Sequence, residues 1–395
     1  MARGRSRADV SSAAVNAVIV EIAPREALAL QRAGAWLVDV REPDEVAQGS
    51  PVGARRVPLA GVVAGLGSLD GARDRTILTI CGSGKRSLRA AEALREAGFA
   101  DVRSIAGGMA SWRADALPEE ATSLLPAQER DRYSRHLLLP GVGEAGQLKL
   151  RAARVVVVGA GGLGSPAAFY LAAAGVGRLR LVDNDRVERS NLQRQILHVD
   201  AGVGETKVAS GAARLRALNP DIEVDARQLR LDATNVEATI ADADVVLDGS
   251  DNFPTRYLLN EACVRLGKPL VYGAIHRFEG QASVFWPAHP SGRVPCYRCL
   301  FPEPPRAEDA PNCAEAGVLG VLPGLVGTMQ ATEAVKLILG VGEPLFGRLL
   351  HFDALAMRFR EVRLPRDPEC PGCGPSAKRS GAYVSYEEIC ASNQR

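Results

Sequence analysis

The sequence of 395 residues has few aromatic side chains, almost no net charge and no long apolar run. Aromatic residues make up 5% of the chain, and the formal net charge is +2. Such a balance does not favour a nucleic-acid binder or a strongly basic membrane-surface protein. No segment reaches the roughly 18 consecutive apolar residues of a membrane span, and no internal repeat is visible. The composition predicts an ordinary globular protein, long enough for two domains.

The N-terminal region and the cysteines indicate the compartment. Residues 1–14 are rich in Arg, Ser and Ala and are expected to form a flexible tail. The beginning of the chain loosely resembles a secretory signal, but Asn16 and Glu21 interrupt the apolar run and no small-residue cleavage site follows. Four of the eight cysteines fall in Cys-x-x-Cys pairs, which favours metal or redox chemistry in a reducing compartment. We therefore expect a cytoplasmic protein.

The first third of the chain alternates strand-like and helix-like stretches. Apolar runs at 36–40 and 76–80 predict strands, and stretches rich in Ala, Leu, Glu and Arg at 24–33 and 87–97 predict helices. This alternation indicates a small α/β domain over residues 15–116.

A second α/β domain is predicted after a linker. Residues 117–127 contain two prolines and show no periodicity, so we expect them to connect the domains. The second domain is expected over 128–373, followed by a loosely held polar tail at 374–395. Its first predicted strand is the run of one arginine and four valines at 154–158. Further strands are predicted at 179–183, 244–248, 269–273 and 281–286.

A glycine motif opens the second domain. Gly159, Gly161 and Gly164 fit G-x-G-x-x-G and lie between four valines and a helix start of small residues. In this context the glycines permit a tight turn and a close approach to phosphate, and the helix N-terminus offers free N–H groups. Asp183 ends the next strand, 19 residues after Gly164 (183 − 164), where a carboxylate commonly holds a ribose hydroxyl. The motif alone indicates a nucleotide, usually NAD or FAD.

The residues after Asp183 favour ATP over NAD. Arg194 and Lys207 add cations, which nucleotidyl transfer needs because negative charge builds on the phosphates in the transition state. Asp248 and Asp251 follow a strand, and a carboxylate there suits the Mg²⁺ that bridges ATP phosphates. Surface charges and a helix N-cap at Asp251 are the alternatives. The combination favours an ATP site.

Two Cys-x-x-Cys pairs, CYRC and CPGC, lie 71 residues apart (370 − 299). Two such pairs supply four thiolates to tetrahedral Zn²⁺, although the wide spacing requires the fold to bring them together. A redox dithiol and plain buried cysteines are the alternatives. Because no ligand set of a catalytic, water-binding zinc is evident, the predicted zinc is structural, and its ligands are Cys296, Cys299, Cys370 and Cys373.

Cys81 lies in the stretch TILTICGSGKRS, which looks like the end of a phosphate loop. The P-loop pattern fails at both ends, because Thr79 occupies its first glycine position and Arg86 follows Lys85 where Ser or Thr is required. What remains is a cysteine between a strand and a helix, surrounded by loop amides and two cations that favour a thiolate or persulfide anion. The alternative is a structural cysteine at a strand end.

Longer motifs resemble a known family. The segments RYSRHLLLPGVGEAGQLKL, DNDRVERSNLQRQILH, DGSDNFPTRYLLN and NCAEAGVLG, with the glycine motif and the cysteine pairs, resemble the MoeB/ThiF-type sulfur-carrier adenylyltransferases of the ubiquitin-activating-enzyme superfamily. The resemblance covers about residues 128–373. It implies a Rossmann-like domain that binds Mg·ATP and adenylylates the C-terminal Gly-Gly carboxylate of a small ubiquitin-like sulfur carrier.

The same resemblance implies site residues. Contacts to the phosphates, the ribose and Mg²⁺ are expected from Gly162, Asp183, Ser190, Asn191, Arg194, Lys207, Asp251 and Asn252. Arg135 is similar to an arginine that the family lends from the neighbouring subunit, which implies a homodimer; a surface charge is the alternative. Cys313 lies where the wider superfamily carries a thioester or acyl-disulfide, a role that is dispensable in the molybdopterin branch, so a covalent role stays open.

The first domain resembles the rhodanese-like sulfurtransferases in LVDVREPDEVAQG, CGSGKRS and IAGGMASW. The resemblance implies that Cys81 carries a persulfide and that Asp39 and Arg41 are structural. Ser50 stands where that family usually has a histidine, which leaves details of packing open.

The two domains together predict a reaction sequence. The second domain would form a carrier acyl-adenylate, and a Cys81 persulfide, loaded by a donor such as a cysteine desulfurase, would attack it. Reduction would then release a carrier thiocarboxylate for molybdopterin, thiamine or another sulfur pathway. The alternatives are an enzyme that conjugates a ubiquitin-like protein through Cys313 with a non-catalytic rhodanese domain, an NAD oxidoreductase, and a non-enzymatic carrier-binding scaffold. Cys263 is expected in the core, and Cys390 has no predicted role.

Overall fold

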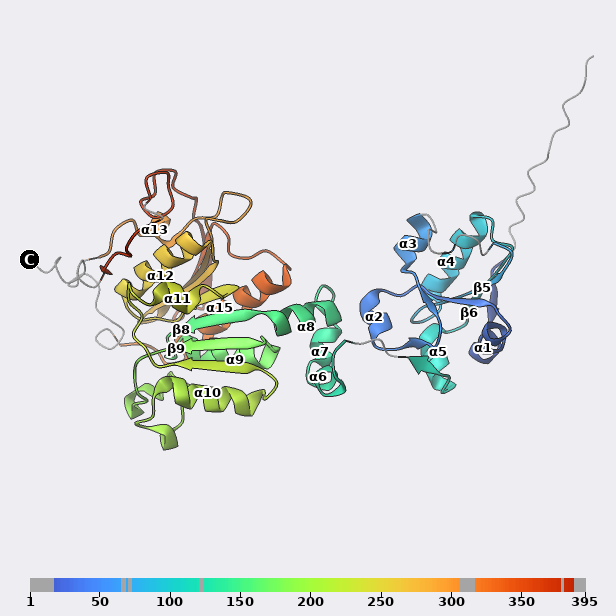
Figure 1. The fold of residues 1–395 in the computed structure, drawn as a ribbon, viewed down its shortest axis with the longest axis horizontal. Helices are drawn as coiled ribbons and strands as arrows, with labels where there is room; N and C mark the ends of the chain where they lie inside the picture. Colours follow the sequence, from blue (N-terminus) through green and yellow to red (C-terminus); the bar gives the residue numbers. More distant parts are fainter. Residues whose placement is uncertain are drawn as a thin grey trace, which may run out of the picture. The chain divides into compact units, whose positions relative to one another are not determined.

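The chain folds into two units, Met1–Gln128 and Glu129–Arg395, each built around its own β-sheet (Figure 1). This computed structural model describes residues 18–64, 69, 73–120, 124–305, 317–377 and 380–386. The predicted fold class of two α/β domains is confirmed. Among the described residues, none of the helices has both the length and the apolar character that crossing a bilayer requires.

The first unit has a sheet of five parallel strands in the order β1-β6-β5-β2-β4. The strands are β1 Val20–Ile22, β2 Trp36–Asp39, β4 Arg55–Arg56, β5 Thr76–Ile80 and β6 Asp101–Ile105. The helices are α1 Pro24–Arg32, α2 Pro43–Ala47, α3 Leu59–Ala64, α4 Lys85–Glu96 and α5 Gly108–Ala114.

Both faces of this sheet are buried, which explains the continuous apolar runs of its central strands. Val38 and Ile77 belong to one core cluster, while Leu37 and Leu78 belong to another. Successive residues of a strand point to opposite faces, so each run feeds two cores.

The segment after α5 is bound to the first unit rather than free. Strand β7, Glu119–Glu120, pairs antiparallel with β3, Ser50–Pro51. The indole Nε1 of Trp112 donates a hydrogen bond of 3.1 Å to the carbonyl of Pro118. The first residues of the expected linker at 117–127 therefore belong to this fold, in a strand too short to leave a sequence pattern.

The second unit has an eight-stranded sheet in the order β10-β9-β8-β11-β12-β13-β14-β15. Its strands are β8 Arg154–Val158, β9 Arg178–Val182, β10 Glu223–Arg227, β11 Val245–Asp248, β12 Leu270–His276, β13 Glu279–Phe285, β14 Arg348–Asp353 and β15 Arg358–Arg363. Its α-helices are α6 Ala127–Arg132, α7 Ser134–Leu137, α8 Gly143–Ala152, α9 Gly164–Ala174, α10 Lys207–Leu218, α11 Val236–Ile240, α12 Phe253–Leu266, α13 Tyr297–Leu300 and α15 Val321–Leu339. Short 3-10 helices lie at η1 Arg189–Asn191 and η2 Asp200–Gly202.

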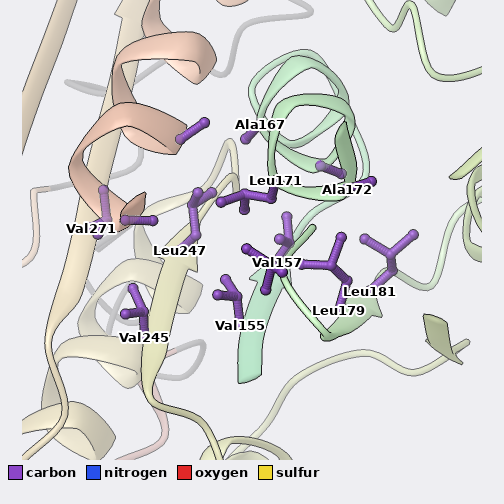
Figure 2. Packing of buried hydrophobic residues seen from close by; sticks show 14 of the residues in the cluster. Val155, Val157, Ala167, Leu171, Ala172, Leu179, Leu181, Val245, Leu247 and Val271 are labelled. Carbon is purple, nitrogen blue, oxygen red and sulfur yellow. The ribbon is translucent and has the colours of Figure 1, made fainter. Parts of the chain in front are cut away.

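The first five strands of this order are parallel, and the last three continue the sheet antiparallel. The four valines of β8 lie at its centre. Val155 and Val157 pack toward the small residues of α9 (Figure 2), whereas Val156 and Val158 join a second cluster with residues of α12. From β8 the chain winds first to β9 and β10 and then returns to β11 on the other side. Ligands of such sheets bind where the strand order reverses, at the carboxyl ends of the strands.

The C-terminal tail differs from its expected loose packing. Arg265 of α12 donates hydrogen bonds to the carbonyls of Gly381 and Ala382, and Tyr386 is 5% exposed. The described end of the chain is thus anchored on the second unit. The stretch is polar on average, and only its two tyrosines, Tyr383 and Tyr386, indicate that it packs against the protein.

Candidate functional site

The glycine motif forms a turn that only glycine fits. Gly159 has a φ of +94°, and a Cβ there would lie 2.5 Å from the carbonyl oxygen of Gly249. A Cβ on Gly164 would meet the carbonyl oxygen of Gly159. The loop after β8 and the loop after β11 therefore touch through their backbones. These two loops flank the point where the strand order reverses.

A cavity of about 300 Å³ opens at this point. Its walls come from the ends of β8, β9 and β11, from the start of α10 and from the segment after β10. Of the residues expected to hold nucleotide or Mg²⁺, the cavity is lined by Gly162, Asp183, Arg194, Lys207, Asp251 and Asn252. The fold thus brings six of the eight expected contacts to one place.

Asp183 and Lys207 are held in place by the backbone and by a second carboxylate. The two carboxylate oxygens of Asp183 accept hydrogen bonds of 2.8 Å from the amides of Ala160 and Asp185. The ammonium of Lys207 lies 2.8 Å from a carboxylate oxygen of Asp185, and its side chain is only 7% exposed. Asp185 also lines the cavity. Sequence reasoning did not identify Asp185, because an acidic residue in a polar stretch carries no signal of its own.

The two aspartates after β11 have separate positions. Asp251 is exposed and lines the cavity. Asn252 is the N-cap of α12, since its side-chain oxygen accepts a hydrogen bond of 3.0 Å from the Thr255 amide. The alternative in which Asp251 caps the helix is therefore wrong. Of Asp248 and Asp251, only Asp251 lines the cavity.

Asp248 is 1% exposed and does not line the cavity. One of its carboxylate oxygens accepts hydrogen bonds from the amide and hydroxyl of Ser250, at 2.9 and 2.6 Å. Burial raises the pKa of Asp248, with Arg256 acting in the opposite direction. Asp248 thus holds Ser250, the residue before Asp251, through two hydrogen bonds.

His198 supports the glycine loop from behind. Its Nε2 lies 2.9 Å from the Ala160 carbonyl and its Nδ1 lies 3.1 Å from the Ser210 hydroxyl. Burial lowers the pKa of His198, so the ring is neutral, donates from Nε2 and accepts at Nδ1. In the sequence, His198 is only the last residue of the segment DNDRVERSNLQRQILH, and nothing there indicates this contact.

Three expected residues stand apart from the cavity. Ser190 and Asn191 lie on η1 and are not among its lining residues, while Arg135 is exposed on α7. Cys313 lies outside the described residues. Cys263 lies on α12 and is buried in the hydrophobic core, as expected, and burial raises the pKa of its thiol.

The two cysteine pairs meet, although 71 residues separate them in the chain (370 − 299). The sulfur atoms of Cys296, Cys299, Cys370 and Cys373 all lie within 4.8 Å of one another. The Cys296–Cys370 and Cys299–Cys373 sulfur distances are 3.5 and 3.6 Å, far longer than a disulfide. Four converging thiols fit a tetrahedral structural metal. Zinc is the metal that the sequence predicts here, and a metal bound by these sulfurs would join the start of α13 to the segment that follows β15.

We expect Cys370→Ser to lose the bound zinc and to lower the free energy of unfolding by about 3 kcal/mol or more, because structural zinc binding is worth on the order of 10 kcal/mol. Metal analysis and thermal unfolding check this. Cys263→Ala, which changes a buried cysteine outside the cluster, should keep one zinc per chain. Full zinc content in Cys370→Ser would contradict the assignment.

Cys81 directly follows β5 and is 1% exposed. Its sulfur accepts a hydrogen bond of 3.1 Å from the Gly84 amide and lies 3.5 Å from the Ser87 hydroxyl. Burial by itself raises the pKa of Cys81, but hydrogen bonds from Ser87 and from the amides of Ser83 and Gly84 outweigh it and lower the pKa. The predicted convergence of loop amides on this sulfur is therefore present.

The start of α5 closes the Cys81 loop from the other side. The amide of Met109 donates a hydrogen bond of 2.7 Å to the Cys81 carbonyl. Gly108 has a φ of +57°, and a Cβ there would meet the same carbonyl oxygen. The glycines of IAGGMASW are thus needed for close packing against the loop.

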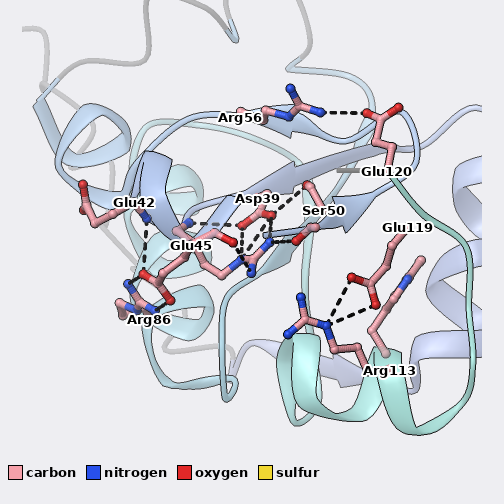
Figure 3. Close-up of polar contacts among 12 residues, drawn as sticks. Asp39, Glu42, Glu45, Ser50, Arg56, Arg86, Arg113, Glu119 and Glu120 are labelled. Carbon is pink, nitrogen blue, oxygen red and sulfur yellow. Dashed lines mark hydrogen bonds and ion pairs between the residues drawn. The ribbon is translucent and has the colours of Figure 1, made fainter. Parts of the chain in front are cut away.

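Charged residues around this loop form two networks (Figure 3). Arg86 binds Glu45 through two hydrogen bonds of 2.7 Å, so its charge is shared with a carboxylate and is not reserved for the sulfur anion. Arg41 binds Asp39 through Nε and Nη2, at 2.9 and 2.6 Å. Ser50, at the position of the usual histidine, donates a hydrogen bond of 2.8 Å to Asp39.

Family comparisons match both units. The model of the ThiF family matches residues 133–372, and the model of the rhodanese-like domain matches residues 23–115. The ThiF match takes in more than half of the chain. This chain belongs to the ThiF family. It also carries an N-terminal rhodanese-like domain, so the family prediction is confirmed for both units.

Named relatives of this ThiF protein include two that it covers almost completely. It is 55% identical over 270 residues to the SAMP-activating enzyme E1 of Haloferax volcanii, spanning 68% of this chain and 98% of that protein. It is 53% identical over 266 residues to the sulfur carrier protein adenylyltransferase of Thermus thermophilus, spanning 67% and 97%. About a third of this chain is left unmatched in both.

A third relative carries both predicted activities in its name. The probable adenylyltransferase/sulfurtransferase MoeZ of Mycobacterium tuberculosis is 49% identical over 271 residues, spanning 69% of this chain and 67% of that protein. Among solved structures, Escherichia coli MccB with ATP aligns with a TM-score of 0.54 at 24% identity, over 65% of this chain and 77% of that one, and supports the fold. Adenylyl transfer and sulfur transfer, as predicted, are the activities named for the relatives.

Proposed function

We propose that this ThiF protein uses ATP to adenylylate the C-terminal Gly-Gly carboxylate of a small ubiquitin-like sulfur carrier and then transfers sulfur to it from a Cys81 persulfide. One observation carries the first half. Glycine-loop, carboxylate and cationic residues from separate strand ends surround a single cavity at the switch point of the sheet. The names of the relatives support the carrier as the substrate.

In the first step a carrier carboxylate oxygen attacks the α-phosphate of ATP, and the bond to the departing pyrophosphate breaks. Arg194 and Lys207, which line the cavity, would stabilise the charge that builds on the phosphates. Asp183 would hold the ribose. Asp251, with Asn252 beside it, would hold Mg²⁺, which when bound neutralises phosphate charge. The product is a carrier acyl-adenylate.

In the second step the terminal sulfur of the Cys81 persulfide attacks the acyl carbon and displaces AMP, which leaves an acyl disulfide. A reducing dithiol then attacks the Cys81 sulfur with its first thiolate, which releases the thiocarboxylate and leaves a mixed disulfide on Cys81. The second thiolate displaces the Cys81 thiol, so the dithiol gives two electrons and becomes a disulfide. The amides around Cys81 suit an anionic sulfur. A cysteine desulfurase is the donor that we propose for the persulfide. Its removal from a reconstituted reaction should stop thiocarboxylate formation.

The test of this function is a pyrophosphate-exchange assay with small proteins that end in Gly-Gly. The cognate carrier should stimulate exchange of labelled pyrophosphate into ATP, and the same carrier without its two terminal glycines should not. If no candidate carrier stimulates exchange in either form, the proposal is refuted. The carrier that works also decides between molybdopterin, thiamine and other sulfur pathways. The free Cys81 thiol suits a reducing compartment, so we also propose a cytoplasmic location, which cell fractionation would check.

We further propose that Arg135 completes the nucleotide site of a partner subunit in a homodimer. It is exposed on α7 and does not line the cavity of its own chain. Arg135→Ala and Asp251→Ala should each be inactive. Mixing them should restore about a quarter of the wild-type exchange rate, because about half of the dimers are mixed and each holds one complete site. Dimers that exchange subunits without regaining activity would contradict the shared site.

A further inference from the structure

The described end of the chain is clamped to α11 and α12 of the second unit. We call residues 381–386 the C-terminal strap. The Arg265 guanidinium donates hydrogen bonds of 2.7 and 3.2 Å to the carbonyls of Gly381 and Ala382, and its central carbon lies 4.0 Å from the centroid of the Tyr383 ring. The Tyr383 hydroxyl donates a hydrogen bond of 3.0 Å to Glu237. These contacts hold the strap at two points.

Tyr386 carries the strap into the core. Its ring packs on that of Tyr257, with centroids 5.4 Å apart, and Tyr257 is fully buried. The Tyr257 hydroxyl lies 3.0 and 2.6 Å from the carbonyls of Phe301 and Glu303. Burial raises the pKa of Tyr386, and the Glu261 carboxylate raises it further, so its hydroxyl stays protonated. The strap therefore ends on the helix that follows the nucleotide loop.

The strap also lines a second cavity that shares wall residues with the nucleotide cavity. This second cavity, of about 220 Å³, has Val384, Ser385 and Tyr386 on one side and the first turn of α12 on the other. Leu231 and Thr255 line both this cavity and the nucleotide cavity. The Thr255 amide donates the hydrogen bond to Asn252 that caps α12. A movement of the strap would thus reach the nucleotide through one layer of side chains.

We propose that the C-terminal strap is a positioning element of the nucleotide site, and that Tyr386 is the positioning residue that seats the first turn of α12 for ATP. The inference rests on the proposed use of ATP. Loss of the strap removes support that the site needs equally in the ground state and in the transition state. Such a change raises KM for ATP and leaves kcat nearly unaltered.

The experiment compares four variants of the full chain. Gly381→stop deletes the strap, whereas Glu387→stop keeps it and is the matched control. Tyr386→Ala removes the packed ring, and Tyr386→Phe retains it. We expect KM for ATP in pyrophosphate exchange to rise about threefold to tenfold in Gly381→stop and Tyr386→Ala, with kcat nearly unchanged. Glu387→stop and Tyr386→Phe should stay close to the wild type.

Direct ATP binding by calorimetry separates this proposal from the proposed function. A weaker Kd for ATP in Tyr386→Ala supports the strap even if no carrier has been found, and a wild-type chain that binds no ATP overturns both. A lower melting temperature with unchanged KM and Kd, measured well below that temperature, would show that the strap only stabilises the fold and would overturn the proposal. Tyr386→Ala keeps the test valid if the deletion does not fold.

Discussion

Asp251→Ala is expected to reduce carrier-dependent pyrophosphate exchange by about a hundredfold or more. A metal ion on the transferring phosphates is worth several kcal/mol, and about 1.4 kcal/mol corresponds to a tenfold change in rate. Asp251 is exposed and lines the cavity, so its removal should alter unfolding free energy by less than about 0.5 kcal/mol. Exchange kinetics at several Mg²⁺ concentrations, with thermal unfolding in parallel, measure both effects.

A matched control for this change is Asp200→Ala. Asp200 is another exposed carboxylate of the same unit, but it pairs with Arg189 and does not line the cavity. It should exchange pyrophosphate at the wild-type rate. If Asp251→Ala and Asp200→Ala behave alike, the magnesium position proposed at the start of α12 is wrong.

Cys81→Ala should abolish thiocarboxylate formation and leave pyrophosphate exchange at the wild-type rate. The cavity proposed for adenylation is lined by residues of the second unit, whereas Cys81 belongs to the first. The missing sulfur removes the only proposed nucleophile for the acyl-adenylate, so the expected loss is complete within the detection limit. Mass spectrometry of the carrier detects the gain of sulfur, and exchange is measured on the same preparation.

The control here is Cys263→Ala, which removes a buried cysteine of the second unit and should leave the yield of thiocarboxylate unchanged. Loss of exchange in a folded Cys81→Ala protein would contradict the proposal that the second unit adenylylates the carrier and the first supplies the sulfur. Persistent thiocarboxylate in that protein would instead move the sulfur chemistry to another residue. A thioester that survives Cys81→Ala but disappears in Cys313→Ala would favour conjugation.

The sequence predicts most reliably those elements in which all residues share one environment. The run at 76–80 is β5, and the valines before Gly159 form β8, because a parallel strand buried on both faces leaves an unbroken apolar run. The glycine positions follow from backbone contacts that exclude a Cβ. The meeting of the cysteine pairs was also predictable, since separated thiol pairs have few other uses.

What the sequence did not reveal depends on contacts between distant segments. Asp185 is paired with Lys207, and Arg86 with Glu45, yet each is an ordinary charge in the printed sequence. Tyr386 gains its place only from the ring of Tyr257. Such pairings come from the tertiary structure, and no local periodicity or propensity records them.

The cysteine cluster has a consequence for how the chain is made. Every residue that lines the nucleotide cavity lies at or before Ile275, whereas Cys370 and Cys373 are among the last residues of the fold. During synthesis every residue that lines the cavity therefore leaves the ribosome before any of the four cysteines, and Cys296 and Cys299 leave it well before Cys370 and Cys373. A polypeptide that stops before Cys370 has half a ligand set. Capture of a metal would thus distinguish chains that extend past Cys373 from chains that stop before Cys370.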